Sequence, residues 1–412
     1  MGWPLVKLGD ICRIELGKTP SRGDASLWDK EKSGSNIWLS IADLPLTGKP
    51  VMWDSKEYIS QKGANLCKVI PAGTLMVSFK LSLGRLAYAG TDLFSNEAIA
   101  SLYFGDNVEI AKDYLFWVLT GFDWDKAVGS DVKVKGKTLN KAKLKEIRIP
   151  LPPIPEQQRI VAILDQAFAD IEKARANAEK NLKNARELFD SYLNQVFSQR
   201  GEGWVKSSLE KEIELLTGYA FKSKDYTEHP EGIPLIRGDN VVQGKIRWDG
   251  VKRWPEEKVS EYVKYQLAEG DVLLAMDRTW VKAGMKYTKI TSNDLPALLV
   301  QRVARMRVHS DFDEDYLFHL LGSKLFETYV LSIQTGLGVP HISGKQIEAF
   351  QFQKPPLRMQ KEIILNVNQL AGDVGRLEIC FSQKLASLDE LKKSLLQKAF
   401  SGELTKTEGM VA

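Results

Sequence analysis

Two long segments of the chain carry apolar residues at alternating steps of three and four positions. The first segment covers residues 156–198, and the second ends near Ser401. Such a pattern predicts a helix with one apolar side that packs against a partner helix. A helix of about 43 residues would span ~64 Å at 1.5 Å per residue, which exceeds the width of a small domain. We therefore predict two spacer helices that fold back on one another as an intramolecular antiparallel coiled coil.

The contact positions of this coiled coil are expected to follow the heptad pattern. They are Ile160, Leu164, Ile171 and Leu188 in the first helix and Ile363, Val367, Val374 and Leu391 in the second. Asn181 and Lys384 put a polar residue at the same point of each seam, where it would fix the register at some cost in stability. Ala174 and Ala178 are expected to receive large side chains such as Leu377. The alternative is two unrelated surface helices.

The two helical segments are copies of one another. Sliding the sequence by 203 positions lays residues 147–198 over 350–401 without a gap, and Gln157 is among the positions that are identical in both copies. A looser repeat precedes each helix, because the tetrapeptide Asp-Tyr-Leu-Phe occurs at 113–116 and again at 315–318. Self-similarity at a fixed period indicates a duplicated structural unit. The predicted order is domain, helix, related domain, related helix.

Each predicted domain carries short apolar runs broken by Gly, Pro, Asn and Asp, which is typical of strands. In the first domain we expect strands at 36–44, 73–79 and 98–104, and one short helix at 113–120 with Asp113 as its cap. The fold class is therefore α+β, with two mixed, mostly β domains separated by two long helices.

The proline-rich segment 151–155 cannot continue a helix or enter a sheet interior, so it marks a join, and residues 354–358 repeat it. We divide the chain into a first domain at 1–150, a join and spacer helix at 151–200, a second domain at 201–350, and a second join, helix and tail at 351–412. Gly402 is a natural helix stop, and the residues after it are expected to form a loose tail.

Composition and charge limit the classes of protein to which this chain can belong. The chain has 412 residues, 43% of them hydrophobic, as in an ordinary globular protein. The net charge of +4 says little, but basic residues concentrate at 126–148 and at 276–307. The three cysteines have no metal or redox spacing, which favours a reducing cytoplasm. No apolar run is long enough for a membrane span, so we expect no membrane role.

Cationic side chains in the first domain are candidates for contact with nucleic acid. Lys133, Lys135 and Lys137 alternate along an extended loop, which would aim all three to one side. Lys80 and Arg85 follow a predicted strand and are weaker candidates. The alternative interpretation of all five is an ordinary solvated charge run.

The second domain offers a different set of candidates. They are Arg237, Arg278, Trp280, Lys282, Gly338 and His341. An Arg can read guanine and a Trp can wedge or stack, whereas a core Trp beside surface charges is the alternative. The loop with Gly338 and His341 stands in the place of the lysine-rich loop of the first domain. Asp239 corresponds to Asp43, and we expect both to cap local backbone groups.

Catalytic motifs are not found. The Gly-Lys-Thr triplets that begin at Gly17 and Gly136 lack the earlier glycine of a phosphate-binding loop. Neither Pro-Pro pair follows Asn or Asp, as adenine methyltransferase motifs require. His229, His309 and His319 have no spacing for a metal site. The sequence therefore gives no support for a catalytic site or a metal site.

Two related basic modules on a spacer are suited to reading two half-sites along duplex DNA. The join Leu-Pro-Pro-Ile-Pro-Glu-Gln-Gln at 151–158, repeated as Lys-Pro-Pro-Leu-Arg-Met-Gln-Lys at 354–361, resembles the specificity subunit of type I restriction-modification systems. The resemblance covers the whole chain. The second copy departs from the pattern at Arg358, Met359 and Lys361, so equal contact of both helix starts with a partner is not implied.

The resemblance implies a non-catalytic DNA-binding subunit with two target-recognition domains. It would read a bipartite, asymmetric site and direct two methyltransferase subunits and the restriction subunits to it, for DNA methylation and host defence. S-adenosylmethionine, ATP and Mg would bind to those partner subunits and not to this chain. The competing hypothesis is a coiled-coil scaffold with two protein-binding domains and no role on DNA.

Overall fold

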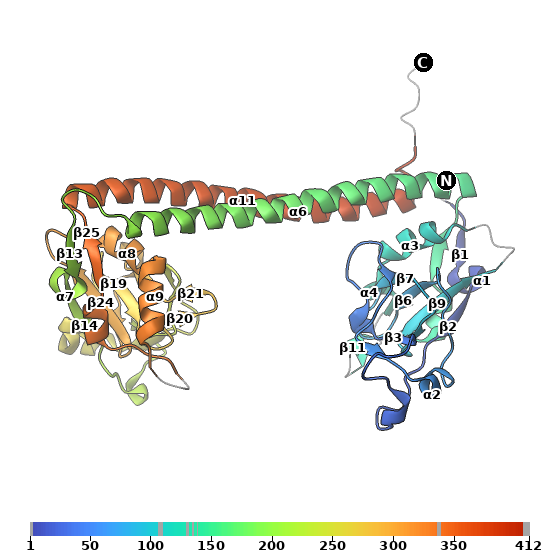
Figure 1. Cartoon of the computed structure of the whole chain (residues 1–412), viewed down its shortest axis with the longest axis horizontal. Coiled ribbons are helices and arrows are strands. Elements are labelled where there is room, and N and C mark those ends of the chain that lie inside the picture. Colours follow the sequence, from blue (N-terminus) through green and yellow to red (C-terminus); the bar gives the residue numbers. More distant parts are fainter. Residues whose placement is uncertain are drawn as a thin grey trace, which may run out of the picture. The chain divides into compact units, whose positions relative to one another are not determined.

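The computed structural model describes residues 3–105, 110–128, 132–133, 136–137, 139–335 and 339–406. These residues form two compact units. The first unit combines residues 1–179 with 382–412, and the second covers 180–381. Both boundaries between the units fall inside long helices, α6 (Ile154–Ser198) and α11 (Leu357–Ser401) (Figure 1).

The first unit is built on a five-stranded sheet. Its order is β2 (Cys12–Leu16), β9 (Ile99–Phe104), β6 (Leu75–Ser78), β7 (Leu86–Ala89) and β4 (Val51–Met52). A three-stranded sheet has the order β5 (Glu57–Tyr58), β3 (Ile37–Leu39) and β8 (Phe94–Ser95), and two pairs are β1 (Leu5–Lys7) with β12 (Arg148–Pro150) and β10 (Val132–Lys133) with β11 (Gly136–Lys137). The short helices are α1 (Leu8–Ile11), α2 (Gln61–Ala64), α3 (Lys112–Thr120), α4 (Trp124–Val128) and α5 (Lys141–Lys145), with 3-10 turns at Ala25–Leu27 and Ile41–Asp43.

The central strand β6 explains how the first core is divided. All four of its residues are buried, and successive side chains of a strand point to opposite faces. Leu75 and Val77 therefore join the core that includes α3, whereas Met76 joins the core around the three-stranded sheet. A continuous apolar run is what a strand covered on both faces requires.

The second unit repeats this arrangement. Its four-stranded sheet has the order β14 (Ile213–Thr217), β24 (Val303–Val308), β19 (Val272–Ala275) and β22 (Tyr287–Lys289), and its three-stranded sheet has the order β18 (Lys252–Trp254), β15 (Ile233–Ile236) and β23 (Leu298–Leu299). The pairs are β13 (Val205–Ser208) with β25 (Gln351–Lys354), β16 (Val241–Val242) with β17 (Lys245–Ile246), and β20 (Trp280–Val281) with β21 (Gly284–Met285). The helices are α7 (Leu209–Glu212), α8 (Glu314–Gly322), α9 (Lys324–Ile333) and α10 (Gly344–Glu348), with 3-10 segments at Ser223–Asp225, Glu256–Tyr265 and Ser292–Asp294.

Strand pairing shows that the two units share one topology. The order β2-β9-β6-β7 is matched by β14-β24-β19-β22, and β5-β3-β8 is matched by β18-β15-β23. In each three-stranded sheet one pairing is antiparallel and the other is parallel. The α+β fold class predicted from the sequence is confirmed.

The long helices α6 and α11 pack against each other, as predicted. In the first unit Glu172 pairs with Lys392 and Arg175 pairs with Asp389. In the second unit the Nε of Arg186 donates to Glu378 Oε1 at 2.5 Å. Residue numbers rise from Glu172 to Arg175 along α6 while those of their partners fall from Lys392 to Asp389 along α11, so the two helices run antiparallel.

The heptad frame places part of the contact stripe wrongly. Ile160, Leu164, Ile171, Val367 and Val374 are buried, and Ile363 is half-buried against the second core. By contrast, the predicted seam residues Leu188 and Leu391 are 60% and 46% exposed. The expected large partner Leu377 is also exposed, as are the expected polar seam residues Asn181 and Lys384.

The heptad spacing holds in the middle of α6, where Leu164, Ile171, Ala178 and Ala185 are each seven positions from the next and all buried. It fails where a helix end packs on a recognition domain, because Phe197 belongs to the second core and Phe400 packs on the first. Leu188 and Leu391 each lie nine residues before one of these phenylalanines. At about 100° per residue they face the opposite side of the helix.

Helix ends also differ from expectation. The first long helix begins at Ile154, so Pro155 lies in its first turn, where its missing N–H leaves no bond unmade. The short helix of the first unit begins at Lys112 with Ala111 at the cap position, so Asp113 is not the cap. Its carboxylate accepts instead from the Tyr88 hydroxyl at 2.8 Å and pairs with Lys49 at 2.9 Å.

Two further expectations need correction. Only Ile37–Leu39 of the predicted strand at 36–44 is extended, because Ser40 and Asp43 close a capping box around the turn that follows. Gly402 ends α11 at a φ of +80°, as predicted. The next residues do not form a loose tail, since Leu404 packs on the first core and Thr405 donates to Glu156. The remainder of the predicted tail, 407–412, lies outside the described residues.

Candidate nucleic-acid interface

The loops after β6 and β19 occupy equivalent places in the two units. The N–H of Leu139 donates to the Phe79 carbonyl at 3.0 Å, and the N–H of Ile342 donates to the Met276 carbonyl at 2.9 Å. Leu139 directly follows the lysine-rich segment of the first unit, and Ile342 directly follows the loop that ends at His341. The two different segments are therefore docked to the same position of the shared fold.

In the second unit this docking brings two candidate residues together. The N–H of Arg278 donates to the Pro340 carbonyl at 2.6 Å, and Asp277 forms a β-bridge with His341. The loop is closed by paired backbone bonds between Thr335 and His341, of 3.0 and 2.8 Å. Arg278 and His341 thus lie on neighbouring segments, although more than 60 positions separate them in the sequence.

Positive charge gathers around the half-buried Lys286. Burial lowers the pKa of its ammonium, and the guanidinium groups of Arg247 and Arg278 lower that pKa further, while Asp239 opposes them. Asp277 also acts on Lys286 and lies 3.7 Å from the Nε of Arg302. Arg247, Arg278 and Arg302 are exposed. These four cations outnumber the two carboxylates, so they form a net positive surface suited to phosphate.

The hairpin β20–β21 carries the other two candidates of this loop. Trp280 is 36% exposed and Lys282 is exposed, so Trp280 is not a core residue. Both follow Arg278 within four positions. A partly exposed indole in a loop that also carries cations is suited to stacking on bases or inserting between them.

Arg237 lies in the loop after β15. Its Nη2 donates to the Gly250 carbonyl at 3.2 Å, and its Nε is buried with no hydrogen-bond partner in the described part of the chain. The predicted correspondence of Asp239 with Asp43 is wrong by one position. Asn240 accepts from the Arg237 N–H at 3.2 Å, as Asp43 accepts from the Ser40 N–H at 2.8 Å.

In the first unit, Lys80 and Arg85 differ in their freedom. Lys80 is half-buried, with its Nζ 5.4 Å from the centre of the Phe79 ring. Arg85 donates through Nη1 to the carbonyls of Ile41 and Leu44, at 3.3 and 3.1 Å. These bonds tie two loops of the fold together, so the Arg85 guanidinium has a structural role.

The lysine-rich segment is described only in part. The backbone of Lys133 lies in β10 and that of Lys137 in β11, and Val132 pairs with Lys137 in this hairpin. Lys135 and Gly338 lie outside the described residues.

Two buried glutamines were not among the site residues predicted from the sequence. Gln157 and Gln360 occupy the same position of the two long helices, and both are fully buried. Gln157 accepts from the Ala111 N–H at 2.9 Å and donates to the Pro152 carbonyl at 2.8 Å. Gln360 accepts from the Asp313 N–H and donates to the Pro355 carbonyl, both at 2.9 Å. Their identity across the repeat was the available signal.

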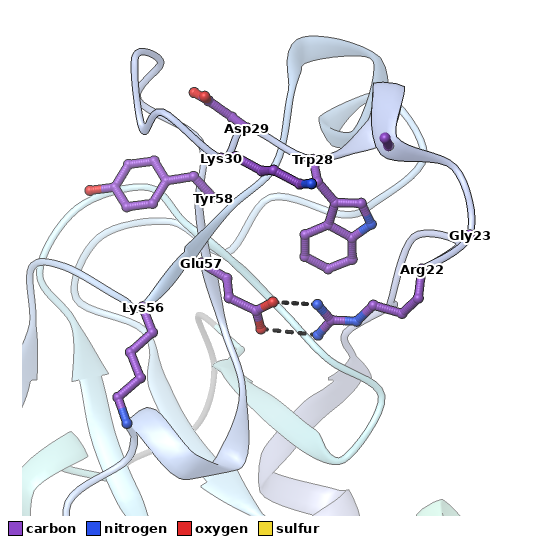
Figure 2. A pocket seen from close by; sticks show the side chains of 9 residues that line it. Arg22, Gly23, Trp28, Asp29, Lys30, Lys56, Glu57 and Tyr58 are labelled. Atoms are coloured by element: carbon purple, nitrogen blue, oxygen red, sulfur yellow. Dashed lines mark hydrogen bonds and ion pairs between the residues drawn. The ribbon is translucent and has the colours of Figure 1, made fainter.

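A cavity of about 390 Å³ lies at the edge of the three-stranded sheet in the first unit. Figure 2 shows the Arg22 guanidinium facing the Glu57 carboxylate, with the Trp28 indole beside it. Nη2 of Arg22 donates to Glu57 at 3.0 Å, and the guanidinium carbon lies 3.9 Å from the Trp28 ring centre. Because Arg22 and Glu57 satisfy each other, this cavity presents no uncompensated charge from that pair.

No group of three or more His, Cys, Asp or Glu side chains within the described residues is placed to hold a metal ion. Among the helices of the described residues, none is long and apolar enough to cross a membrane.

Comparisons with known proteins agree with one another. The family model described as the type I restriction modification DNA specificity domain matches residues 1–180 and again 201–371. The MjaVIII specificity subunit of Methanocaldococcus jannaschii is 26% identical over 98% of this chain and 93% of that protein. The EcoAI specificity subunit of Escherichia coli is 33% identical, over 50% of this chain and 35% of that protein.

Solved structures show the same fold. A chain from a study of complex assembly and conformational transition in the type I R-M system has a TM-score of 0.76 and 18% identity, covering 98% of both chains. The HsdS subunit from Thermoanaerobacter tengcongensis has a TM-score of 0.59 and 19% identity, covering 98% of this chain and 97% of that one. The duplicated fold and the two matches of the family model together show that this chain belongs to the type I restriction-modification DNA specificity subunits, whose role in the restriction-modification complex is non-catalytic.

Proposed function

We propose that this chain reads a split, asymmetric DNA sequence with one half-site for each of its two recognition domains, at 1–150 and 201–350. Family membership supports a role in DNA specificity. The observation that carries the split, asymmetric reading is the shared topology of the two units combined with different residues at equivalent loops. One fold presented twice with different contact residues would bind two different half-sites.

The proposed contact residues come from the loops that meet after β6 and β19. In the second domain they are Arg278, Trp280, Lys282 and His341, together with Gly338, which precedes His341 in the sequence. Arg237, in the loop after β15, is a further proposed contact. The pairing of Arg278 with the 339–341 segment supports their action as one surface. In the first domain the proposed residues are Lys80, Lys133, Lys135 and Lys137. The bonds of Arg85 to backbone carbonyls favour a supporting role for that residue.

The proposed partners are two methyltransferase subunits and the restriction subunits of the same system. S-adenosylmethionine, ATP and Mg would bind to those subunits, which would carry out the chemistry. A cytoplasmic location follows from the proposed DNA target and from free cysteines. The two long helices would act as the spacer that sets the gap between half-sites.

The test is a methylation assay with the chain assembled with its methyltransferase subunits. Duplexes would carry two selected half-sites at the selected gap, or the same half-sites with the gap changed by a few base pairs. We expect methyl transfer only at the selected gap, and a steep loss of binding as salt rises. Methylation that ignores the gap, or that needs only one half-site, would contradict the proposal.

A further inference from the structure

A leucine at the tip of the loop after β6 combines exposure with an unusual backbone. Leu81 is 59% exposed and has a φ of +63°. Residues other than glycine rarely adopt this left-handed backbone conformation, because their Cβ comes close to the neighbouring carbonyl oxygen. Glycine would adopt the same backbone without strain. The chain therefore holds an apolar side chain in solvent at a position where glycine fits better.

The loop around Leu81 is tightly closed. The fully buried Ser78 accepts from the Arg85 N–H at 2.9 Å through its hydroxyl, which also donates to the Ser82 carbonyl. The N–H of Gly84 donates to the Ser78 carbonyl at 2.8 Å. One buried serine thus fixes both sides of the loop, and the tip is presented in one conformation. Non-glycine residues held in this region cluster at ligand-contacting sites.

The second unit repeats this geometry with a different side chain. Leu75 of β6 pairs with Leu102, and Val272 of β19 pairs with Met306 at the equivalent place, so Leu81 corresponds to Arg278. Arg278 is also exposed and has a φ of +46°. The next residue, Thr279, is buried and donates to the Met276 carbonyl at 3.1 Å. Two of the four non-glycine residues with positive φ in the described part of the chain therefore occupy this one position.

The surroundings of Leu81 favour a contact with DNA. Lys80 precedes it, and the bond from Leu139 to the Phe79 carbonyl holds the end of the lysine-rich segment beside the same loop. In protein–DNA complexes cations take the phosphates, while exposed apolar side chains contact the thymine methyl group or wedge between base steps. An apolar tip next to Lys80 is suited to that division of roles.

We infer that Leu81 is a base-contacting, specificity-determining residue of the first recognition domain. It reads one half-site through apolar contact, and its counterpart Arg278 reads the other through hydrogen bonds. This inference rests on the proposed function, since it names the residues that make the two half-sites differ. The two half-sites would then differ because the equivalent loop tips of the two domains carry different residues, Leu81 and Arg278.

The experiment uses the chain assembled with its methyltransferase subunits and a library of duplexes with a randomised core. Bound duplexes are sequenced for the wild type and for Leu81→Ala, Leu81→Gly and Leu81→Arg. Leu5→Ala is the matched control, because Leu5 is exposed to the same extent, 59%, on β1. Thermal melting checks the fold, and Leu81→Gly should melt no lower than wild type because it removes the backbone strain.

The expected result is local. Leu81→Ala and Leu81→Gly lower affinity for the selected site about tenfold and flatten base preference at one or two adjacent positions of one half-site. The other half-site is unchanged, and Leu5→Ala behaves as wild type. Leu81→Arg shifts the preference at those positions toward guanine.

Three outcomes overturn the inference. If Leu81→Ala and Leu81→Gly keep full affinity and preference while Arg278→Ala loses preference in its half-site, the proposed function stands and Leu81 is not a reading residue. If the Leu81 variants fail to retain the methyltransferase subunits but keep base preference, Leu81 is a protein contact. If the wild-type complex selects no split site at all, the proposed function itself fails.

Discussion

Arg278 illustrates how a single residue is prepared for recognition. Its backbone is fixed by the bond to Pro340 and by the buried Thr279 that follows it. Its guanidinium is exposed beside Lys286, whose pKa is lowered by burial and by the neighbouring arginines. Four cations against the two carboxylates of Asp239 and Asp277 leave a net positive charge, which an incoming phosphate or the acceptor edge of guanine would stabilise.

Replacing Arg278 with alanine tests this role. Arg278→Ala should weaken binding of the selected duplex about tenfold and relax base preference in one half-site, because a bidentate contact to guanine is lost. Binding constants at several salt concentrations, with sequencing of selected duplexes, measure both effects. The matched control is Arg358→Ala, which removes the same charge from a side chain that is 90% exposed on α11. Equal losses in the two variants would contradict a base-reading role for Arg278.

His319 on α8 gives a prediction about stability at low pH. Burial lowers its pKa, and its Nε2 lies 3.0 Å from the Asn368 side-chain oxygen. In the unfolded chain the pKa of this imidazole has its ordinary value near 6.5. Below that pH the unfolded state therefore takes up a proton that the folded state excludes. The stability contribution is therefore complete above about pH 6.5 and is lost as pH falls toward the folded pKa.

The measurement compares thermal melting at about pH 7.5 and about pH 5.5. Between these two pH values the melting temperature should fall further in the wild type than in His319→Gln, because glutamine can keep a hydrogen bond without titrating. An unchanged pH dependence in His319→Gln would show that His319 does not contribute to this loss.

At the scale of elements, each recognition domain is joined to its long helix by one buried glutamine. Gln157 links the start of α6 to the residue before α3, and Gln360 links the start of α11 to the cap of α8. Both side chains also bond the carbonyl of a proline in the join. The same set of hydrogen bonds therefore occurs in both units. It fixes each long helix against its domain, because a buried side-chain amide cannot exchange its partners for water.

Removing these hydrogen bonds should loosen the joint in the first unit. Gln157→Ala leaves the Ala111 N–H and the Pro152 carbonyl buried without that partner, at an expected cost of about 1–3 kcal/mol. Urea unfolding measures the cost, and hydrogen exchange at the Ala111 amide should become faster. The neighbouring Gln158→Ala is the control, because Gln158 is exposed. Exchange at Ala111 that stays as slow as in wild type would exclude this role for Gln157.

For the molecule as a whole, duplication provides two versions of one recognition fold and two helices that pair in antiparallel fashion. We propose that these helices work as a spacer, so that helix length sets the gap between half-sites. The cross-helix pairs Glu172–Lys392 and Arg186–Glu378 are separated by 14 residues on each helix, so an insertion into one helix between them would break the register.

Lengthening both helices tests the spacer proposal. Four residues added to each helix, near Ala178 and Phe381, extend the pair by ~6 Å, on the order of two base pairs of duplex. The selected gap should grow by that amount while the bases of each half-site stay the same. An insertion into α6 alone is the control, since it shifts the register of the cross-helix pairs and should weaken the complex instead. A gap that does not respond to the matched insertion would rule out the spacer role.

The sequence by itself determined the features that depend on local pattern. Helix periodicity, the echo at 203 positions and the proline joins predicted two paired helices, the α+β class and the family. These signals are readable because neighbouring residues set helical periodicity and proline forbids an N–H bond whatever the rest of the chain does.

Only the tertiary structure decided which residues meet. Packing of the helix ends on the two cores left Leu188 and Leu391 exposed, and long-range backbone bonds brought His341 beside Arg278. Arg85 was a plausible ligand contact in the sequence, yet its guanidinium binds two backbone carbonyls. Residues far apart in the chain acquire their partners only through packing, so the strained tip at Leu81 and the bonding partners of the two glutamines could be recognised only in three dimensions.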